Sequence, residues 1–207
     1  MSLNMRILKR SRKAPRAGDV FVLKILKDRY HFGRVIRTDT HIGFWDNVIL
    51  IYLYKDTSSS KLDLPELNKN RLLIPPQGID RAPWVRGYFE TIAHSPITKA
   101  DVLRVHCFCS PGSEGYSGEK YYDDEGRRLR RRIEPCGVFG LGTDGTIDDE
   151  MSDALGIPRC PESVAEDKRR EEALKRKAAR WRPRDQEWLD KHPAIRKFLA
   201  EHPADEG

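Results

Sequence analysis

The sequence predicts an α+β protein, mainly antiparallel β, built as a curved sheet or small barrel with a short lid helix and a charged helical C-terminal tail. Runs rich in β-branched and aromatic residues alternate with short polar turns, which is typical of hairpins. One run, residues 48–54, is apolar throughout and predicts a strand covered on both faces. After residue 160 the chain changes to blocks of lysine and glutamate, which predict an exposed helix.

Two hairpins are expected. Residues 20–26 and 30–36 flank a short polar turn and form the first, with Gly33 marking a bulge or a close approach of two backbones. The second surrounds the glycine turn at Gly126. Further short strands are expected at residues 72–74, 88–92 and 103–109.

A short helix is predicted for residues 146–155. It begins with hydroxyl and acidic residues suited to an N-cap and a first turn, and Gly156 occupies the C′ position. Ile147 and Met151 fall on one face, so the helix is expected to cover the sheet.

Charge divides the chain into three parts: a basic flexible leader (residues 1–16), a β-rich domain (17–160) and a charged helical tail (161–207). The net charge of +6 comes from the leader, which has six basic and no acidic residues. The rest of the chain is electrically balanced, so the basic pI does not predict a nucleic-acid-binding domain.

The tail has two segments. Residues 161–180 lack an apolar face and predict an exposed spacer. Beyond them is an apolar stripe at helical spacing, expected to dock on the domain or on a partner: Trp188, Ile195, Phe198 and Leu199.

Composition excludes some classes of protein. No apolar run approaches the roughly 18 residues that span a bilayer, and the basic N-terminus lacks the apolar segment of a secretory signal. Four cysteines are too few for a disulfide scaffold, so we expect a reduced, cytoplasmic protein.

The sequence offers no convincing catalytic, metal or cofactor set. A serine nucleophile elbow is missing, the histidines lack metal-binding spacing, and the pair Cys107 and Cys109 is read as buried thiols. The basic cluster at residues 127–132 is flanked by acids, which favours ion pairs on a solvated face over a phosphate-binding or acidic-partner role. Binding is therefore favoured over catalysis.

Several short motifs share their order and spacing with a known family. They are Gly18-Asp19-Val20-Phe21, Phe32-Gly33-Arg34-Val35, Gly43-Phe44-Trp45-Asp46, Gly87-Tyr88-Phe89-Glu90-Thr91-Ile92 with Pro96-Ile97, and Tyr121-Tyr122-Asp123 with Gly126. Together they resemble the immunity protein 26 family of bacterial polymorphic toxin systems, over roughly residues 15–135.

The resemblance implies a cytoplasmic protein that binds and neutralises a cognate protein toxin. Some members of the group are described as organophosphate (phosphotriester) hydrolases, which is the alternative, and it would need a metal held by the histidines. The residues chosen as toxin-binding candidates are large or charged side chains at expected loops and strand ends: Trp45, Asp46, Trp84, Tyr121 and Tyr122.

Overall fold

The computed structural model describes residues 3–26, 28–43, 45–110, 118–180, 190–194 and 196–197. The chain forms two compact units. One comprises Met1–Ser110 and Tyr121–Cys160, and the other comprises Pro111–Lys120 and Pro161–Gly207. The first unit carries both β-sheets and two short helices, and it ends where the composition of the chain changes.

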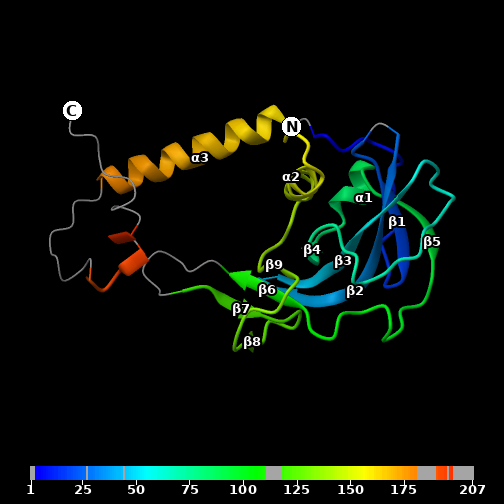
Figure 1. The fold of residues 1–207 in the computed structure, drawn as a ribbon, viewed down its shortest axis with the longest axis horizontal. Helices are drawn as coiled ribbons and strands as arrows, with labels where there is room; N and C mark the ends of the chain where they lie inside the picture. The colour runs from blue at the N-terminus through cyan, green and yellow to red at the C-terminus, as the bar shows by residue number, and fades with distance from the viewer. Residues whose placement is uncertain are drawn as a thin grey trace. The chain divides into compact units, whose positions relative to one another are not determined.

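The first unit is built on an open five-stranded antiparallel sheet in the order β4-β3-β2-β1-β5 (Figure 1). Its strands are β1 (Asp19–Leu23), β2 (Tyr30–Ile42), β3 (Trp45–Ser58), β4 (Gln77–Ile79) and β5 (Glu90–His94). Strands β1 and β2 form the first predicted hairpin. The sheet does not close into a barrel, so of the two predicted forms the open sheet is the observed one.

Strand β3 is covered on both faces, as its apolar run predicts. Along the strand, Ile49, Ile51 and Leu53 point into one buried cluster with Phe21 and Trp84. The alternate residues point into a second cluster, which contains Val48, Leu50, Tyr52, Tyr54 and Phe108. Because side chains of a strand alternate between faces, one continuous apolar run supplies two cores.

A second, four-stranded sheet has the order β8-β7-β6-β9. Its strands are β6 (Cys107–Ser110), β7 (Lys120–Tyr122), β8 (Arg128–Leu129) and β9 (Cys136–Val138). Strands β7 and β8 form the second predicted hairpin, whereas β6 and β9 pair in parallel, which the sequence did not predict. Residues 72–74 form no strand, although Leu72 makes an isolated bridge to Tyr54.

Two helices complete this unit. Helix α2 (Asp144–Leu155) is the predicted lid; Thr143 caps its N-terminus and Gly156 ends it in the left-handed conformation. Its residues Ile147 and Met151 are fully buried in the first core cluster. Helix α1 (Ala82–Arg86) was not predicted, because five residues are too few to show a helical period.

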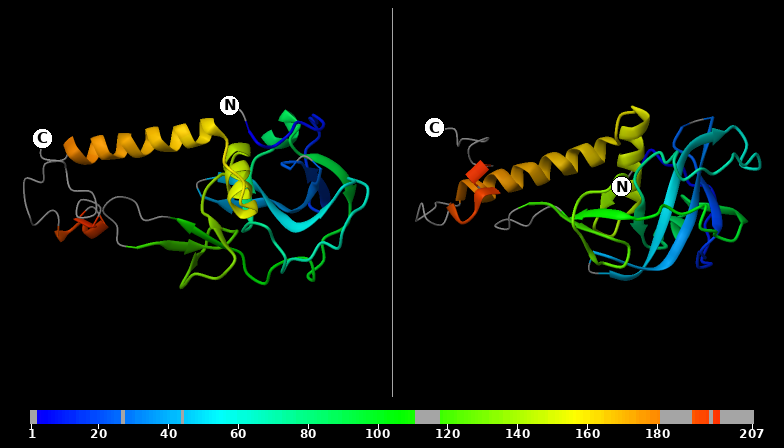
Figure 2. Two further views of the ribbon diagram at one scale, coloured as in Figure 1. Left: turned by 45° about the horizontal axis from the view of Figure 1, so that its top comes forward. Right: turned by 60° about the horizontal axis from the view of Figure 1, so that its bottom comes forward.

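The N-terminal residues are part of this unit. Residues 3–16, which we call the strap, run beside α1 and α2 (Figure 2). Met5 is 3% exposed, and the backbone N–H groups of Asn4 and Met5 donate to Asp148 of α2 at 3.0 and 2.6 Å. The leader therefore packs on the β-rich domain at Asn4 and Met5, a contact that the sequence did not predict. The prediction of a flexible leader rested on the basic charge of residues 1–16 and did not take account of the buried Met5.

The second unit contains helix α3 (Pro161–Arg180). Its Val164 and Leu174 are exposed, and ion pairs four residues apart link Glu166 to Arg170 and Glu172 to Arg176. This agrees with a helix that is polar on every side. The predicted stripe of Trp188, Ile195, Phe198 and Leu199 lies outside the described residues. No helix within the described ranges is long and apolar enough to cross a membrane.

Candidate functional site

The tip of the β2–β3 hairpin presents the largest exposed aromatic side chain of the described residues. Trp45 is 56% exposed, and Asp46 beside it is also exposed. Asp46 Oδ1 lies 2.5 Å from Nδ1 of His41 across the hairpin. The turn uses left-handed backbone at Gly43 (φ 72°) and Asn47 (φ 56°), so the tip has a defined shape.

The β7–β8 turn supports this tip from the second sheet. The Asp123 carboxylate accepts the backbone N–H groups of Glu125 and Arg127 at 3.0 and 2.8 Å, which fixes the turn. The His41 N–H then donates to the Asp124 carbonyl at 2.9 Å. Gly126 permits this approach, because a Cβ there would lie 2.5 Å from the His41 ring.

A third segment completes the support. Tyr122 stacks on Phe139, with ring centroids 4.1 Å apart and planes at 14°. A Cβ on Gly43 would lie 3.2 Å from the Gly140 Cα, so the residues after β9 meet the hairpin tip. We call the area carried by Trp45, Asp46, Tyr121 and Tyr122 the hairpin-tip surface, because the contacts above join the segments that carry them.

A buried chain of polar groups lies beneath this surface. The Tyr52 hydroxyl accepts the Leu103 N–H at 3.1 Å, which leaves its own hydrogen for Nε2 of His106 at 2.6 Å. Nδ1 of His106 lies 3.2 Å from Asp124 Oδ1, and the other Asp124 oxygen accepts from Arg37 at 2.8 Å. The chain joins β3 to the start of β6 and to the β7–β8 turn.

The order Tyr-His-Asp resembles a catalytic relay, but its environment makes it structural. Tyr52 is fully buried, and burial raises the pKa of its hydroxyl well above the ordinary value of 10.0. Burial is the largest single effect on Asp124 and would raise its pKa, but several smaller effects, led by the hydrogen bond from His106, together outweigh it and lower the pKa to about 2. A buried tyrosine that stays protonated, with all partners satisfied, has no free atom for a substrate.

The histidines of the hydrolase alternative do not converge. His41 pairs with Asp46, His94 pairs with Asp19, and His106 belongs to the buried chain. His31 is buried, and neither of its ring nitrogens has a hydrogen-bond partner among the residues that the structure describes. Among the described residues, no group of three or more histidine, cysteine, aspartate or glutamate side chains is arranged to hold a metal ion. The geometry gives the hydrolase alternative no support.

One family comparison gives a result. The sequence model of the family described as Immunity protein 26 matches residues 16–110. This part of the chain, a little under half of it, is similar to the immunity protein 26 family. The match confirms the resemblance for β1 to β6 and ends before the β7–β8 hairpin. Searches of the curated proteins and of the solved structures give no match.

Most residues that carry the immunity protein 26 resemblance serve the fold. Gly18 has φ 92°, and a Cβ there would lie 2.4 Å from the Ser95 carbonyl oxygen. A Cβ on Gly33 would lie 2.3 Å from the Phe21 ring. The buried Arg34 holds the β5–β6 connection by donating to the Ser95 and Pro96 carbonyls at 3.0 and 3.1 Å. These three residues are needed for the packing of the sheet, so we look for a binding surface at other residues.

Trp45 and Asp46 are exposed motif residues that belong to neither core cluster. Their neighbour Phe44 lies outside the described residues. Of the other candidates, Tyr121 and Tyr122 are half-buried on β7. Trp84 is 1% exposed and packs edge-on against Phe21 and Phe89, so it stabilises the core and lies outside the hairpin-tip surface.

The sequence reasoning missed the buried chain. The sequence placed His106 among the histidines of the hydrolase alternative and Asp124 among the acids beside the basic cluster, and it predicted no contact between them. The prediction of buried thiols is confirmed for Cys107, which is buried and donates a hydrogen bond to the sulfur of the free Cys136 at 3.2 Å, but Cys109 is only half-buried. No local signal in the sequence pairs Tyr52 with His106, because 54 residues separate them.

Proposed function

We propose that this protein is an immunity protein that binds a cognate bacterial protein toxin through the hairpin-tip surface and neutralises it in the cytoplasm. The observation that carries the proposal is the exposure of Trp45, in a chain whose residues 16–110 match an immunity family. Exposed tryptophans in a defined frame are the residues on which binding energy concentrates. The free thiols suit a reducing compartment.

The frame around Trp45 supports binding in a further way. Glycine turns, the His41–Asp46 contact and the His41–Asp124 hydrogen bond hold the tip before any partner arrives. Ordering a flexible side chain on binding costs roughly 0.5–1.5 kcal/mol, and a tip that is already ordered avoids part of that cost. A rigid aromatic anchor with an adjacent carboxylate fits a partner surface that offers an apolar recess beside a basic group.

The experiment is co-expression with the toxin encoded beside this gene, followed by co-purification and titration. We expect the wild-type chain to restore growth and to co-purify with the toxin. Trp45→Ala should weaken binding by about 30-fold or more, the value for an interface hot spot. Its melting temperature should match the wild type, because Trp45 is outside the core.

Leu62→Ala is the matched control. Leu62 is 84% exposed and follows β3, so the substitution removes an exposed apolar side chain away from the hairpin tip. It should leave binding unchanged. Failure of the wild-type chain to rescue growth or to co-purify would contradict the proposed function. Equal losses in Trp45→Ala and Leu62→Ala would contradict the assignment of the surface.

A further inference from the structure

The structure contains a groove that the hairpin-tip surface does not involve. It has a volume of about 330 Å³ and lies between the strap and strand β5. Lys9, Lys13 and Arg16 line one side, and residues 90–94 line the other. Both walls belong to the first unit of the chain.

The wall formed by the strap is fixed in place. The N–H groups of Leu8 and Lys9 donate to the Gly87 carbonyl at 2.7 and 3.2 Å, and the Ser11 N–H donates to the Trp84 carbonyl at 2.9 Å. Gly87 has φ 93°, and a Cβ there would lie 3.0 Å from the Arg10 side chain. The strap therefore passes close to α1, and the basic residues around it have a defined position.

The charge of the groove is positive. Lys9 and Lys13 are exposed and have no ion pair within the described ranges. The acids of the groove are already engaged: Glu90 accepts from Lys61 at 2.9 and 3.0 Å, and Asp19 lies 2.8 Å from His94 Nδ1. Arg16 lies 3.9 Å from Asp19, so Lys9 and Lys13 are the basic side chains of the groove that are left for a partner.

Strand β5 supplies the other wall and an open edge. It is the last strand of the five-stranded sheet and pairs with β1 on one side. In the part of the chain that the structure describes, no backbone hydrogen bond joins its outer edge to another segment. Outward-facing N–H and C=O groups of such an edge match those of an extended peptide.

We propose that this groove binds an acidic, extended segment of a partner protein, which adds as a strand to the outer edge of β5 while its carboxylates face Lys9 and Lys13. Edge hydrogen bonds would provide the register, and the basic strap would select for negative charge. A nucleic acid would meet the same cations but has no groups that continue a β-ladder. The inference names a second surface and does not depend on the partner being a toxin.

The test uses the full chain and a fluorescent peptide about ten residues long, in which glutamate alternates with threonine, a residue that favours strands. Two competitors are a peptide with glutamine in place of glutamate and a single-stranded DNA of equal charge. We expect the acidic peptide to bind at least about tenfold more tightly than either competitor, with affinity falling as salt rises. Amides of residues 90–94 should become protected from hydrogen exchange in the complex.

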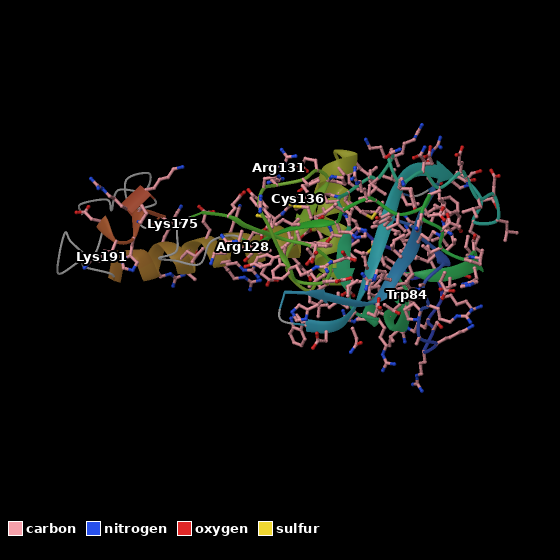
Figure 3. All side chains as sticks on the ribbon, turned by 90° about the horizontal axis from the view of Figure 1, so that it is seen from below. Trp84, Arg128, Arg131, Cys136, Lys175 and Lys191 are labelled. Carbon is pink, nitrogen blue, oxygen red and sulfur yellow. The ribbon has the colours of Figure 1, made fainter. Side chains whose placement is uncertain are left out.

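A pair of charge-reversed variants locates the site. Lys9→Glu with Lys13→Glu should weaken peptide binding by about tenfold or more. Arg128→Glu with Arg131→Glu is the control, since both arginines are exposed, make no ion pair among the described residues, and lie apart from Trp84, whose carbonyl accepts the Ser11 N–H of the strap (Figure 3). It should bind the peptide as the wild type does.

Four results would overturn the inference. They are no binding of the acidic peptide, equal loss in the two double variants, unchanged exchange at residues 90–94 in the complex, and tighter binding of the DNA. Melting curves of each variant check the fold. The salt dependence and the exchange measurement, made on the wild-type chain, keep the inference testable if a variant is unstable.

Discussion

At the scale of single residues, His106 and His31 show how surroundings decide the behaviour of one side chain. His106 is buried, and both of its ring nitrogens have partners, Tyr52 and Asp124. His31 lies in β2 opposite Leu23 and Thr57 and is equally buried, but neither of its nitrogens has a partner. Burial without a counter-charge disfavours the protonated form, and it lowers the pKa of His31 to about 4.

We expect His31 to make the stability of the protein depend on pH between 6.5 and 4. The unfolded chain takes up a proton below its ordinary pKa of 6.5, whereas the folded chain resists protonation down to about 4. Stability should therefore fall by roughly 3 kcal/mol as the pH drops through this range, and level off below it. Urea unfolding at several pH values would measure the loss. In His31→Leu the slope between pH 6.5 and 4 should be shallower; parallel curves for the two proteins would contradict the assignment.

Met5 provides a second prediction for a single residue. Its side chain fills the first core cluster, so Met5→Ala should lower the free energy of unfolding by about 2–5 kcal/mol. Ile7→Ala is the control in the same strap, because Ile7 is 57% exposed and its loss should change stability by about 0.5 kcal/mol or less. Chemical denaturation measures both. Equal effects would mean that the strap is not anchored at Met5.

At the scale of elements, the β7–β8 turn determines how the hairpin tip is held. Gly126 has φ 73° and leaves room for the His41 ring, so Gly126→Ala should separate the two hairpins and destabilise the protein by about 1 kcal/mol or more. Gly140→Ala is the matched control, since a Cβ there would meet only ordinary contacts, the nearest at 3.9 Å. Melting curves and toxin titration measure the effect. If both variants bind the toxin like the wild type, the turn does not support the tip.

The sequence pattern was enough to predict the helices and strands whose formation depends on neighbouring residues alone. The β1–β2 hairpin, the doubly covered strand β3 and the capped helix α2 follow from period, turn residues and caps. The parallel β6–β9 pair and the strap were missed because each depends on partners distant in sequence. Asn4 donates a hydrogen bond to Ser152, which is 148 positions away in the sequence. The distribution of charge along the chain does not indicate such a contact.

The candidate site was predictable to a similar extent. Trp45 and Asp46 could be selected from sequence as large or charged residues in a turn, and the structure places them in the open. The sequence could not show that Trp84, unlike Trp45, is buried. Helix α1, which contains Trp84, has only five residues, too few for a pattern that tells a buried face from an exposed one. The groove beside β5 could not be predicted, since no local pattern indicates that the basic leader lies beside this strand.

At the scale of the whole molecule, the two ends of the chain should contribute unequally to stability. Deletion of residues 1–14 removes Met5 and the hydrogen bonds to Asp148 and should lower the melting temperature by about 5 °C or more. A chain ending at Cys160 retains both sheets and α2, and we expect it to melt within about 2 °C of the full chain.

Thermal melts of the three chains make this comparison. A large loss on removal of residues 161–207 would mean that the tail, including the stripe from Trp188 to Leu199, stabilises the first unit. No loss on removal of residues 1–14 would contradict the role of the strap. Circular dichroism should show less helix in the chain ending at Cys160, because α3 is absent from it.

The contacts between the strap and α2 also affect how the protein is made. Met5 leaves the ribosome 143 positions before its partner Asp148. The five strands of the main sheet are synthesised before then, but this part of their core stays uncovered until α2 emerges. A nascent chain therefore exposes apolar surface from the synthesis of β1 until that of α2, so slow translation after β9 should favour aggregation or chaperone binding.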